Sequence, residues 1–466
     1  HTLPITMSEP VDVGVDLGTT VTKAVALGLG GQVRARAALA TRWDQPHLDW
    51  AEREADTVHD VVDQLLRDVV DRAGDVVVRS VGFASIAETG ALVDRDGRAV
   101  SPLIAWHDPR GGVQAQGLDP EVAAAFPART GLPVNSVATL FKLLWLRDEA
   151  GCDLRGLQWL SLPELVCHRL GGGRVSERSL LGRTGLWDIH DDAPFGPALA
   201  ALGVGPEFVP PPVAAGAAVG RIRRDHPVAR ARGAVLTIAG HDHLVAAAAV
   251  GAGAVGAVCD SIGTAEALVA AVPAPPEPPE VARLVARGLA VYPHVVHGTT
   301  CLLGALRTGL VLGRALDLLG MTTTDSRFAF DAGAPVGSRP ADVVLDGLAM
   351  GADRVRLEWA QGEDPYAVWA AVLGATRAVV RAELETMRSS GVDVSHLVVT
   401  GGWAHLGSVV RSREGLADDT KRVHVEEPGA AGAALFGRWA ATRHPDGTDP
   451  STHRGPHAGW FPDPSA

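Results

Sequence analysis

Lysine is scarce in this chain. The 466 residues contain lysine only at positions 23, 142 and 421, and arginine makes up the rest of the 42 basic residues. None of these lysines follows a glycine, so the sequence has no Gly-Lys-Ser/Thr phosphate loop. Basic tracts are absent, and 54 acidic residues give a formal net charge of −12. A nucleic-acid groove needs lysines and arginines that replace phosphate counterions, so we expect no nucleic-acid partner.

Cysteines and long apolar runs are also few. The four cysteines lie singly, without a Cys-x-x-Cys pair, which excludes a disulfide framework or zinc finger and favours a reducing, cytoplasmic location. The longest uncharged apolar run, 244–259, is shorter than the roughly 20 residues of a membrane-spanning helix. We therefore expect buried core there and no membrane association. We expect no signal peptide and expect the natural protein to begin at Met7.

What the sequence does contain is a repeated strand-turn-strand pattern. Apolar residues alternate over 11–28 around the turn Asp-Leu-Gly-Thr-Thr at 16–20. A similar pattern covers 254–272 around Asp-Ser-Ile-Gly-Thr at 260–264. The two openings predict two similarly built halves.

Helical and strand patterns alternate along the rest of the chain, which predicts α/β layers. The expected helices cover 55–71, 140–147 and 366–388, the expected strands cover 80–85 and 396–400, and a hairpin is expected around 94–97. We place one domain at 7–236 and a second at 237–443. The segment 444–466 is rich in proline, glycine, aspartate and histidine, and we expect a flexible tail.

The first turn carries groups suited to phosphate. Gly18 lets the backbone approach a ligand, and the hydroxyls of Thr19 and Thr20 can donate to phosphate oxygens. Asp16 can hold a metal ion through water. Aspartate and glycine are also ordinary in tight turns, so this turn alone leaves both interpretations open. Lys23 neutralises phosphate charge or is simply a surface lysine.

The second turn favours the phosphate interpretation. Gly263 and Thr264 repeat the turn chemistry, and two such hairpins facing each other across a cleft would clamp the phosphates of a nucleotide. We therefore interpret both turns as nucleotide-binding.

His241, Asp242 and His243 follow a buried strand pattern and precede an alanine-rich helical pattern. A carboxylate at such a junction projects into a cleft, where Asp242 can accept a proton from a substrate hydroxyl. Asp242 can also cap the helix, and both roles can coexist. A metal triad of these residues is a further alternative, but adjacent residues rarely converge on one ion without other ligands.

The chain contains a series of motifs: Asp-Leu-Gly-Thr-Thr at 16–20, Trp-His-Asp-Pro-Arg at 106–110, Thr-Gly-Leu-Pro at 130–133 with Lys-Leu-Leu-Trp at 142–145, Gly-His-Asp at 240–242, Ser-Ile-Gly-Thr at 261–264 and Thr-Gly-Gly-Trp at 400–403. In this order the motifs resemble those of FGGY carbohydrate kinases, and the resemblance covers residues 11–439.

This resemblance implies an α/β, two-domain actin-like ATPase fold, which is ribonuclease H-like, with a cleft between the halves. It implies transfer of the γ-phosphoryl group of ATP, with Mg²⁺, to a sugar or polyol hydroxyl. Asp242 would be the general base and Asp16 the magnesium-associated carboxylate. The residues implied for ATP binding are Asp16, Gly18, Thr19, Thr20, Lys23, Gly263, Thr264, Gly401 and Gly402. Phosphoryl transfer depends on positioning and charge neutralisation, which suits such a site.

The sugar pocket departs from well-known members of that family. At the position where this chain has Ala-Glu-Thr (87–89), glycerol kinases of that family have a segment similar to Arg-Glu-Thr. They also carry an aromatic residue in place of Val137. The Met-His pair of xylulose kinases is also missing. The remaining candidates for sugar binding are Glu88, Asp108 and His243, and Trp106 is either core or a platform under the sugar ring. Glu88 could instead be a solvated loop acid.

We therefore predict an ATP-dependent sugar kinase that acts on a pentulose, as xylulose kinases do, or on a related polyol. The alternatives are a kinase for a sugar acid, erythritol or glycerol, a non-catalytic regulator of the same fold, and a phosphatase acting on nucleotides. The intact Asp16, Asp242 and both turns argue against the regulator. The expected partner is a small sugar or polyol, and a homodimer is left open.

Overall fold

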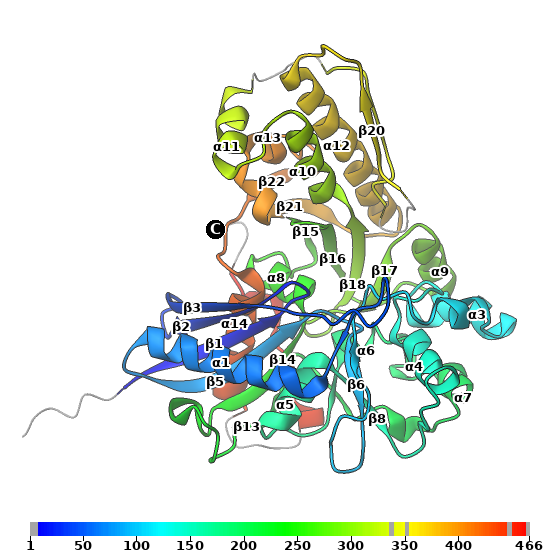
Figure 1. Cartoon of the computed structure of the whole chain (residues 1–466), viewed down its shortest axis with the longest axis vertical. Helices are drawn as coiled ribbons and strands as arrows, with labels where there is room; N and C mark the ends of the chain where they lie inside the picture. The colour runs from blue at the N-terminus through cyan, green and yellow to red at the C-terminus, as the bar shows by residue number, and fades with distance from the viewer. Residues whose placement is uncertain (1–7, 335–339, 350–353, 445–449, 463–466) are drawn as a thin grey trace, which may run out of the picture.

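The computed structural model describes residues 8–334, 340–349, 354–444 and 450–462. The start expected at Met7 lies outside these ranges. Figure 1 shows two α/β parts, one built around β1–β3, β5 and β14 and the other around β15, β16 and β21. This arrangement confirms the predicted α/β class. Among the helices described, none is both long enough and apolar enough to cross a bilayer.

A mixed sheet with the order β13-β14-β5-β1-β2-β3 forms the first half. The predicted meander is present because Gly18 permits the tight turn after β1, where a Cβ would lie 2.6 Å from the Val21 carbonyl oxygen. The amphipathic helix α1 (Ala55–Ala73) connects β3 to β5 through the short strand β4 (Glu52–Arg53). The sheet strands are β1 (Glu9–Leu17), β2 (Val21–Gly28), β3 (Val33–Ala40), β5 (Val76–Ser85), β13 (Ala218–Arg221) and β14 (Val235–His241).

An insertion between β5 and β13 packs around its own aromatic core, in which the Phe126 ring lies 5.7 Å from Phe141 and 6.2 Å from Phe195. Its strands β6 (Gly90–Val93) and β8 (Gln158–Ser161), far apart in sequence, pair antiparallel. Its helices are α2 (Gly112–Gln116), α3 (Pro120–Thr130), α4 (Thr139–Asp148), α5 (Leu162–Leu170), α6 (Arg178–Leu181) and α7 (Gly196–Leu202). Its other short strands are β7 (Leu103–Ile104), β9 (Ser176–Glu177), β10 (Trp187–Asp188), β11 (Ala193–Pro194) and β12 (Pro212–Val213).

The second half repeats the central arrangement of the first. Strand β15 pairs antiparallel with β16 and parallel with β21, as β1 pairs with β2 and β5. This similarity confirms the prediction from the two turns. The sheet strands are β15 (Gly256–Ile262), β16 (Glu266–Val272), β17 (Ala290–Pro293), β18 (Thr300–Leu306), β21 (Val394–Thr400) and β22 (Asp419–Arg422).

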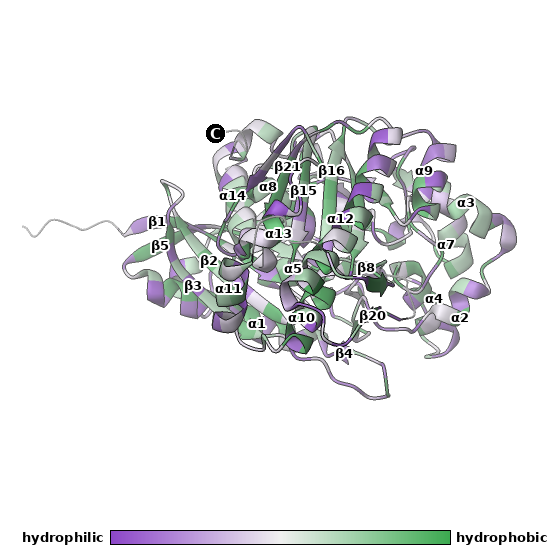
Figure 2. Ribbon diagram, turned by 90° about the horizontal axis from the view of Figure 1, so that it is seen from above, coloured by the Kyte–Doolittle hydropathy of each residue, from purple (hydrophilic) through white to green (hydrophobic). Residues whose placement is uncertain are grey.

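Helices cover the second sheet, whose strands β15, β16 and β21 are mainly hydrophobic in Figure 2, whereas α9 carries hydrophilic residues as well. The long helix expected at 366–388 is α12. The helices are α9 (Pro278–Ala286), α10 (Thr308–Leu318), α11 (Thr324–Gly333), α12 (Pro365–Ser389) and α13 (Gly407–Arg411), and β19 (Val343–Asp346) pairs antiparallel with β20 (Arg356–Trp359).

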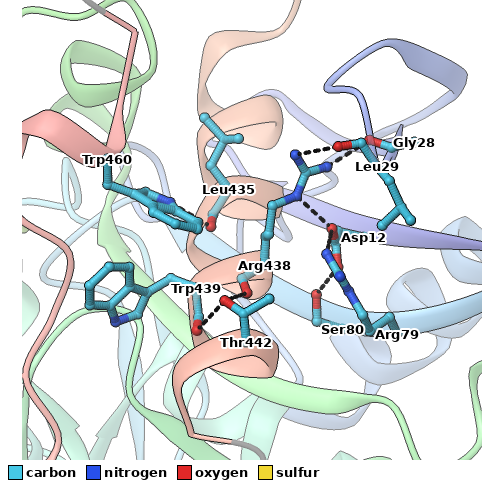
Figure 3. Close-up of polar contacts among 10 residues, drawn as sticks. All are labelled: Asp12, Gly28, Leu29, Arg79, Ser80, Leu435, Arg438, Trp439, Thr442 and Trp460. Atoms are coloured by element: carbon cyan, nitrogen blue, oxygen red, sulfur yellow. Dashed lines mark hydrogen bonds and ion pairs between the residues drawn. The ribbon is translucent and has the colours of Figure 1, made fainter.

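The last helix, α14 (Pro428–Arg443), returns to the first sheet. Close approach requires glycine, because a Cβ on Gly14 would lie 1.8 Å from the Ala430 carbonyl oxygen. Arg438 of α14 and Arg79 of β5 both bind the buried Asp12 carboxylate, with Arg438 Nε at 2.9 Å (Figure 3). The chain passes from the first half to the second between β14 and β15 and returns to the first half with α14, so it crosses between the halves twice.

These crossings differ from the expected domain limits. Residue 236 lies inside β14, and the change of sheet follows α8 (Asp242–Ala249), while α14 packs on the first half although 237–443 was expected to form the second. The expected flexible tail differs as well, since residues 450–462 pack on α14. There, Trp460 Nε1 donates to the Leu435 carbonyl oxygen at 3.3 Å (Figure 3). Residues 445–449 and 463–466 of that tail lie outside the described ranges.

Candidate active site

Asp242 lies at the junction of β14 and α8, the strand–helix junction that the sequence predicts. Its Oδ1 accepts the His243 backbone N–H at 2.7 Å and lies 3.3 Å from His241 Nε2. Among the described residues, no protein hydrogen bond reaches Oδ2, and the side chain is 21% exposed. Oδ2 is therefore the oxygen open to a ligand.

Several charged groups face the same space as Asp242. The pKa of Asp242 is raised to about 7, mainly by burial and also by the charge of Glu88, while the hydrogen bond from His243 lowers it. Burial also raises the pKa of Asp16 to about 7, with a further contribution from Asp242 and an opposing one from Lys23. Burial lowers the pKa of His243. The site thus brings together the carboxylates of Asp16, Glu88 and Asp242.

Asp16 fits a magnesium ligand. Its Oδ1 is shielded from solvent and has no hydrogen-bond partner among the described residues. Its Oδ2 points at the first turn of α14, where a Cβ on Gly429 would come within 2.4 Å. An unpartnered carboxylate oxygen is the kind of donor that Mg²⁺ prefers.

The alternative metal triad is less suitable. Ligand atoms of His241, Asp242 and His243 lie within 4.8 Å of one another. However, His241 Nδ1 already lies 2.8 Å from the Tyr292 hydroxyl, and its Nε2 faces Asp242. The buried imidazole is thus held by protein groups on both sides.

Glu88 is placed by a strained turn and a buried cation. It has a φ of 61°, and the Thr89 N–H donates to the Ala87 carbonyl oxygen at 2.8 Å across it. Arg183 Nε donates to Glu88 Oε1 at 2.6 Å, and Nη2 forms a second contact with the same oxygen. Glu88 is thus buried rather than a solvated loop acid.

The first turn is tied to the expected sugar platform. Trp106 Nε1 donates to Thr19 Oγ1 at 3.0 Å, and Trp43 Nε1 donates to the Thr19 carbonyl oxygen at 2.8 Å. The Thr19 hydroxyl keeps its own proton for a ligand, and Thr20 is exposed. The side chain of Lys142, buried in α4, holds the Trp106 loop, since Nζ donates to the Trp106 carbonyl oxygen at 3.2 Å.

Lys23 is paired rather than isolated at the surface. Its Nζ lies 2.6 Å from Glu427 Oε2, immediately before α14. Glu427 lines a pocket of about 460 Å³, together with Arg36 of the first half and Gly401 and Gly402 of the second. The pocket therefore lies between the two halves.

Gly401 is required by its backbone. It has a φ of 92°, and a Cβ would lie 2.5 Å from the Ile262 carbonyl oxygen, at the end of β15. Gly402 is exposed, with open space where a Cβ would be. The second turn is held from behind, because a Cβ on Gly309 would lie 1.7 Å from the Gly263 carbonyl oxygen. Thr264 is exposed beside it.

Asp108 departs from its expected role in sugar binding. Its carboxylate is fully buried and accepts hydrogen bonds from the Ala51 N–H at 2.7 Å and from Arg110 Nε and Nη2 at 2.9 and 2.8 Å. Arg110 in turn lies over the Trp50 ring at 4.2 Å. Asp108 therefore fixes the loop that carries Trp106 and does not face the site.

Two site residues were missed by sequence reasoning. Arg183 carries no motif signal of its own, and its partner Glu88 is 95 residues away. Tyr292 is one of only two tyrosines in the chain, and that rarity was the available signal.

The chain is similar in sequence to known sugar kinases. The chain is 28% identical over 224 residues to an L-fuculokinase of Salmonella typhi, covering 47% of each chain. It is 28% identical over 253 residues to a xylulose kinase of Streptomyces coelicolor, covering 52% of this chain and 50% of the relative. The matches thus span about half the length of these curated relatives.

Solved structures match over nearly the whole chain. A xyloylose kinase from Brucella ovis has a TM-score of 0.81 at 22% identity and covers 97% of this chain and 95% of its own. Plasmodium falciparum glycerol kinase with ADP has a TM-score of 0.79 at 16% identity, covering 92% and 89%. These identities establish the fold alone. Residues 11–251 match the N-terminal domain of the FGGY family of carbohydrate kinases, and the chain belongs to that family.

Proposed function

We propose that this protein is an ATP-dependent carbohydrate kinase that phosphorylates a hydroxyl group of a neutral acceptor. The acceptor is a ketose, such as a pentulose, or a related polyol. The observation that supports this most is the open Oδ2 of Asp242, which shares one space with Asp16 and Glu88. A base beside a metal-binding carboxylate is the arrangement that phosphoryl transfer to an alcohol needs.

In this proposal the nucleotide lies in the pocket between the halves. Adenosine would rest against Gly401 and Gly402, where the absence of side chains leaves room. The phosphates would extend toward Thr19, Thr264 and Lys23. The ADP in the related glycerol kinase structure supports a nucleotide in this fold.

Asp16 would hold Mg²⁺, which neutralises charge on the phosphate oxygens when bound. Asp242 Oδ2 would accept the proton of the acceptor hydroxyl. The hydroxyl oxygen would bond to the γ-phosphorus while the bond to the ADP oxygen breaks, and ADP would leave with that electron pair. Every atom is then accounted for as sugar phosphate, ADP and a proton on Asp242.

The charges around the sugar pocket favour a neutral acceptor. The guanidinium of Arg183 is neutralised by Glu88, and the ammonium of Lys142 donates to the carbonyl oxygens of Trp106 and Ser136. Neither cation is left to pair with a substrate carboxylate, although gluconokinases are among the relatives. The fuculokinase and xylulose kinase relatives support a ketose.

The test is coupled ADP release with MgATP against L-fucose, its ketose isomer L-fuculose, D-xylulose, D-ribulose, erythritol, glycerol and gluconate, with a no-acceptor control. Asp242→Asn should lower turnover by roughly 10²–10⁴ while ATP binding stays nearly intact, because loss of a general base costs about that much. Wild-type turnover in Asp242→Asn would refute the assignment. ATP consumption without any acceptor would favour a hydrolase instead.

A further inference from the structure

Tyr292 connects the second half of the molecule to the candidate base. It lies on β17, is fully buried, and its hydroxyl is 2.8 Å from His241 Nδ1. The other ring nitrogen of His241, Nε2, is 3.3 Å from Asp242 Oδ1. The imidazole is therefore interposed between a phenol from one half and a carboxylate in the other.

The direction of these hydrogen bonds follows from the protonation states. Burial lowers the pKa of His241 well below its ordinary value, so the ring is neutral and carries one N–H. Burial raises the pKa of Tyr292 well above its ordinary value, so the phenol keeps its proton. Cys301 lies opposite Tyr292 on β18, and burial raises the pKa of its thiol, so this neighbour is also neutral.

Only one tautomer satisfies all of these groups. With the proton on His241 Nε2, Nδ1 accepts from the Tyr292 hydroxyl and Nε2–H donates to Asp242 Oδ1. With the proton on Nδ1, the lone pair of Nε2 would face the carboxylate oxygen and repel it. The carboxylate of Asp242 thus favours the tautomer with Nε2–H, and the phenol stabilises that tautomer by donating its proton to Nδ1.

The position of Tyr292 is itself fixed by close contact between the halves. The Val291 N–H donates to the Gly131 carbonyl oxygen at 2.9 Å, and a Cβ on Gly131 would lie 1.7 Å from the Val291 carbonyl oxygen. A Cβ on Gly182 would lie 2.9 Å from Tyr292 Cβ. The Arg183 guanidinium lies 5.0 Å from the Tyr292 ring centroid.

We propose that Tyr292 is a positioning residue, whose hydroxyl fixes the tautomer of His241 so that Nε2–H holds Oδ1 of Asp242 and leaves Oδ2 for the acceptor hydroxyl. This rests on the proposed function, because Asp242 is its base. It goes further in making a residue of the second half part of the machinery that holds the base.

The test is Tyr292→Phe, which removes the hydroxyl and keeps the ring against Arg183. The chain offers a matched control in Tyr366→Phe, since Tyr366 is the other tyrosine and stacks on Phe330 at 4.6 Å in the second half. We expect kcat to fall about tenfold or more in Tyr292→Phe, as for the loss of a hydrogen bond that supports a charged group, with little change in the KM values for acceptor and ATP. Tyr366→Phe should match the wild type in all three constants.

A second variant separates positioning from folding. The amide of His241→Gln carries fixed N–H groups and can donate to Asp242 without help from Tyr292. In that background, adding Tyr292→Phe should cost nothing, whereas the same change costs about tenfold when His241 is present. Equal losses in both backgrounds would overturn the proposal and indicate a structural role.

The tautomer can also be read without substrate. In ¹⁵N-histidine-labelled protein, the His241 signals, assigned by their loss in His241→Gln, should report Nε2–H in the wild type and a shift toward Nδ1–H in Tyr292→Phe. Unchanged signals together with unchanged kcat would overturn the inference while wild-type turnover still upheld the kinase. Absence of acceptor-dependent turnover in the wild type would overturn the proposed function, and the inference with it.

Discussion

The guanidinium of Arg183 and the carboxylate of Glu88 form a buried ion pair across 95 residues of chain. Glu88 has a backbone φ of 61°, which is a strained conformation for a residue other than glycine. The buried guanidinium of Arg183 holds its side chain in place. Each charge neutralises the other, and the pair presents hydrogen-bonding edges without net charge to the site. The arginine comes from the segment that follows α6, because the residue before Glu88 in this chain is Ala87.

Glu88→Gln should change which acceptor is preferred. The substitution leaves the Arg183 charge buried without a counter-ion, which is costly unless a ligand supplies the opposite charge. We expect kcat/KM for the best neutral ketose to fall about 10- to 100-fold, while the ratio of gluconate to ketose activity rises. The kcat/KM values for the ketose and for gluconate are measured for the wild type and for Glu88→Gln. The control is Glu121→Gln, at an exposed position of α3. An unchanged ratio would contradict the role assigned to the pair.

Gly401 and Gly402 should respond differently to alanine. Gly401→Ala places a Cβ 2.5 Å from the Ile262 carbonyl oxygen at a φ of 92°, and we expect it to destabilise the fold by about 2 kcal/mol or more and to weaken ATP binding. Gly402→Ala meets open space and should leave the unfolding free energy nearly unchanged. Denaturant unfolding and ATP titration measure both effects. Equal stability of the two variants would show that the turn tolerates a side chain.

The acceptor-dependent kcat/KM should rise with pH up to about pH 7. Asp242 must be deprotonated to act as a base, and burial, together with the charge of Glu88, raises its pKa to about 7. The neighbouring Asp16, His243 and Arg183 face the same space, and Mg²⁺ on Asp16 would lower the midpoint by offsetting negative charge. Glu88→Gln should therefore move the acidic limb to lower pH. A limb that stays in place would mean that another group controls it.

Local sequence patterns predicted the elements but not all of their partners. The meander at 9–40, the strand-turn-strand at 256–272 and the helix α12 follow from alternation and helical periodicity, which are local properties. The docking of α14 on the first sheet depends on close approach to Gly14, far away in sequence, and a helical pattern does not show which sheet it covers. The same applies to the packing of 450–462 on that helix.

The site was predicted in part for the same reason. Asp16 and Asp242 lie where strand ends put them, and strand ends are visible in the sequence. The burial of Asp108 depends on Arg110 and Ala51, and the roles of Arg183 and Tyr292 depend on partners 51 or more residues away. Such pairings arise only when the insertion, the first sheet and β17 pack together.

His294 should make the fold sensitive to acid. It follows β17, is buried, and burial lowers its pKa to about 3 from an ordinary value of 6.5. Its Nδ1 accepts the Val296 N–H at 3.0 Å, and its Nε2 has no partner among the described residues. Below pH 6.5 the side chain of His294 binds a proton in the unfolded chain, whereas in the folded protein it stays neutral until the pH approaches 3. The stability from a neutral His294 is therefore present above pH 6.5 and is lost as the pH falls toward 3.

His294→Asn should remove this dependence while keeping the turn. The asparagine Oδ1 can accept the same Val296 N–H but cannot be protonated in this range. Between pH 6.5 and 4, we expect the slope of unfolding free energy against pH to be smaller in the variant by up to about 1.4 kcal/mol per pH unit. The partly exposed His396→Asn on β21 is the control. Urea unfolding at several pH values measures the slopes, and equal slopes in wild type and His294→Asn would show that the buried ring is protonated in the folded state. In that case Nε2 of His294 must gain an acceptor as the pH falls, since an unpaired imidazolium would not persist in the core.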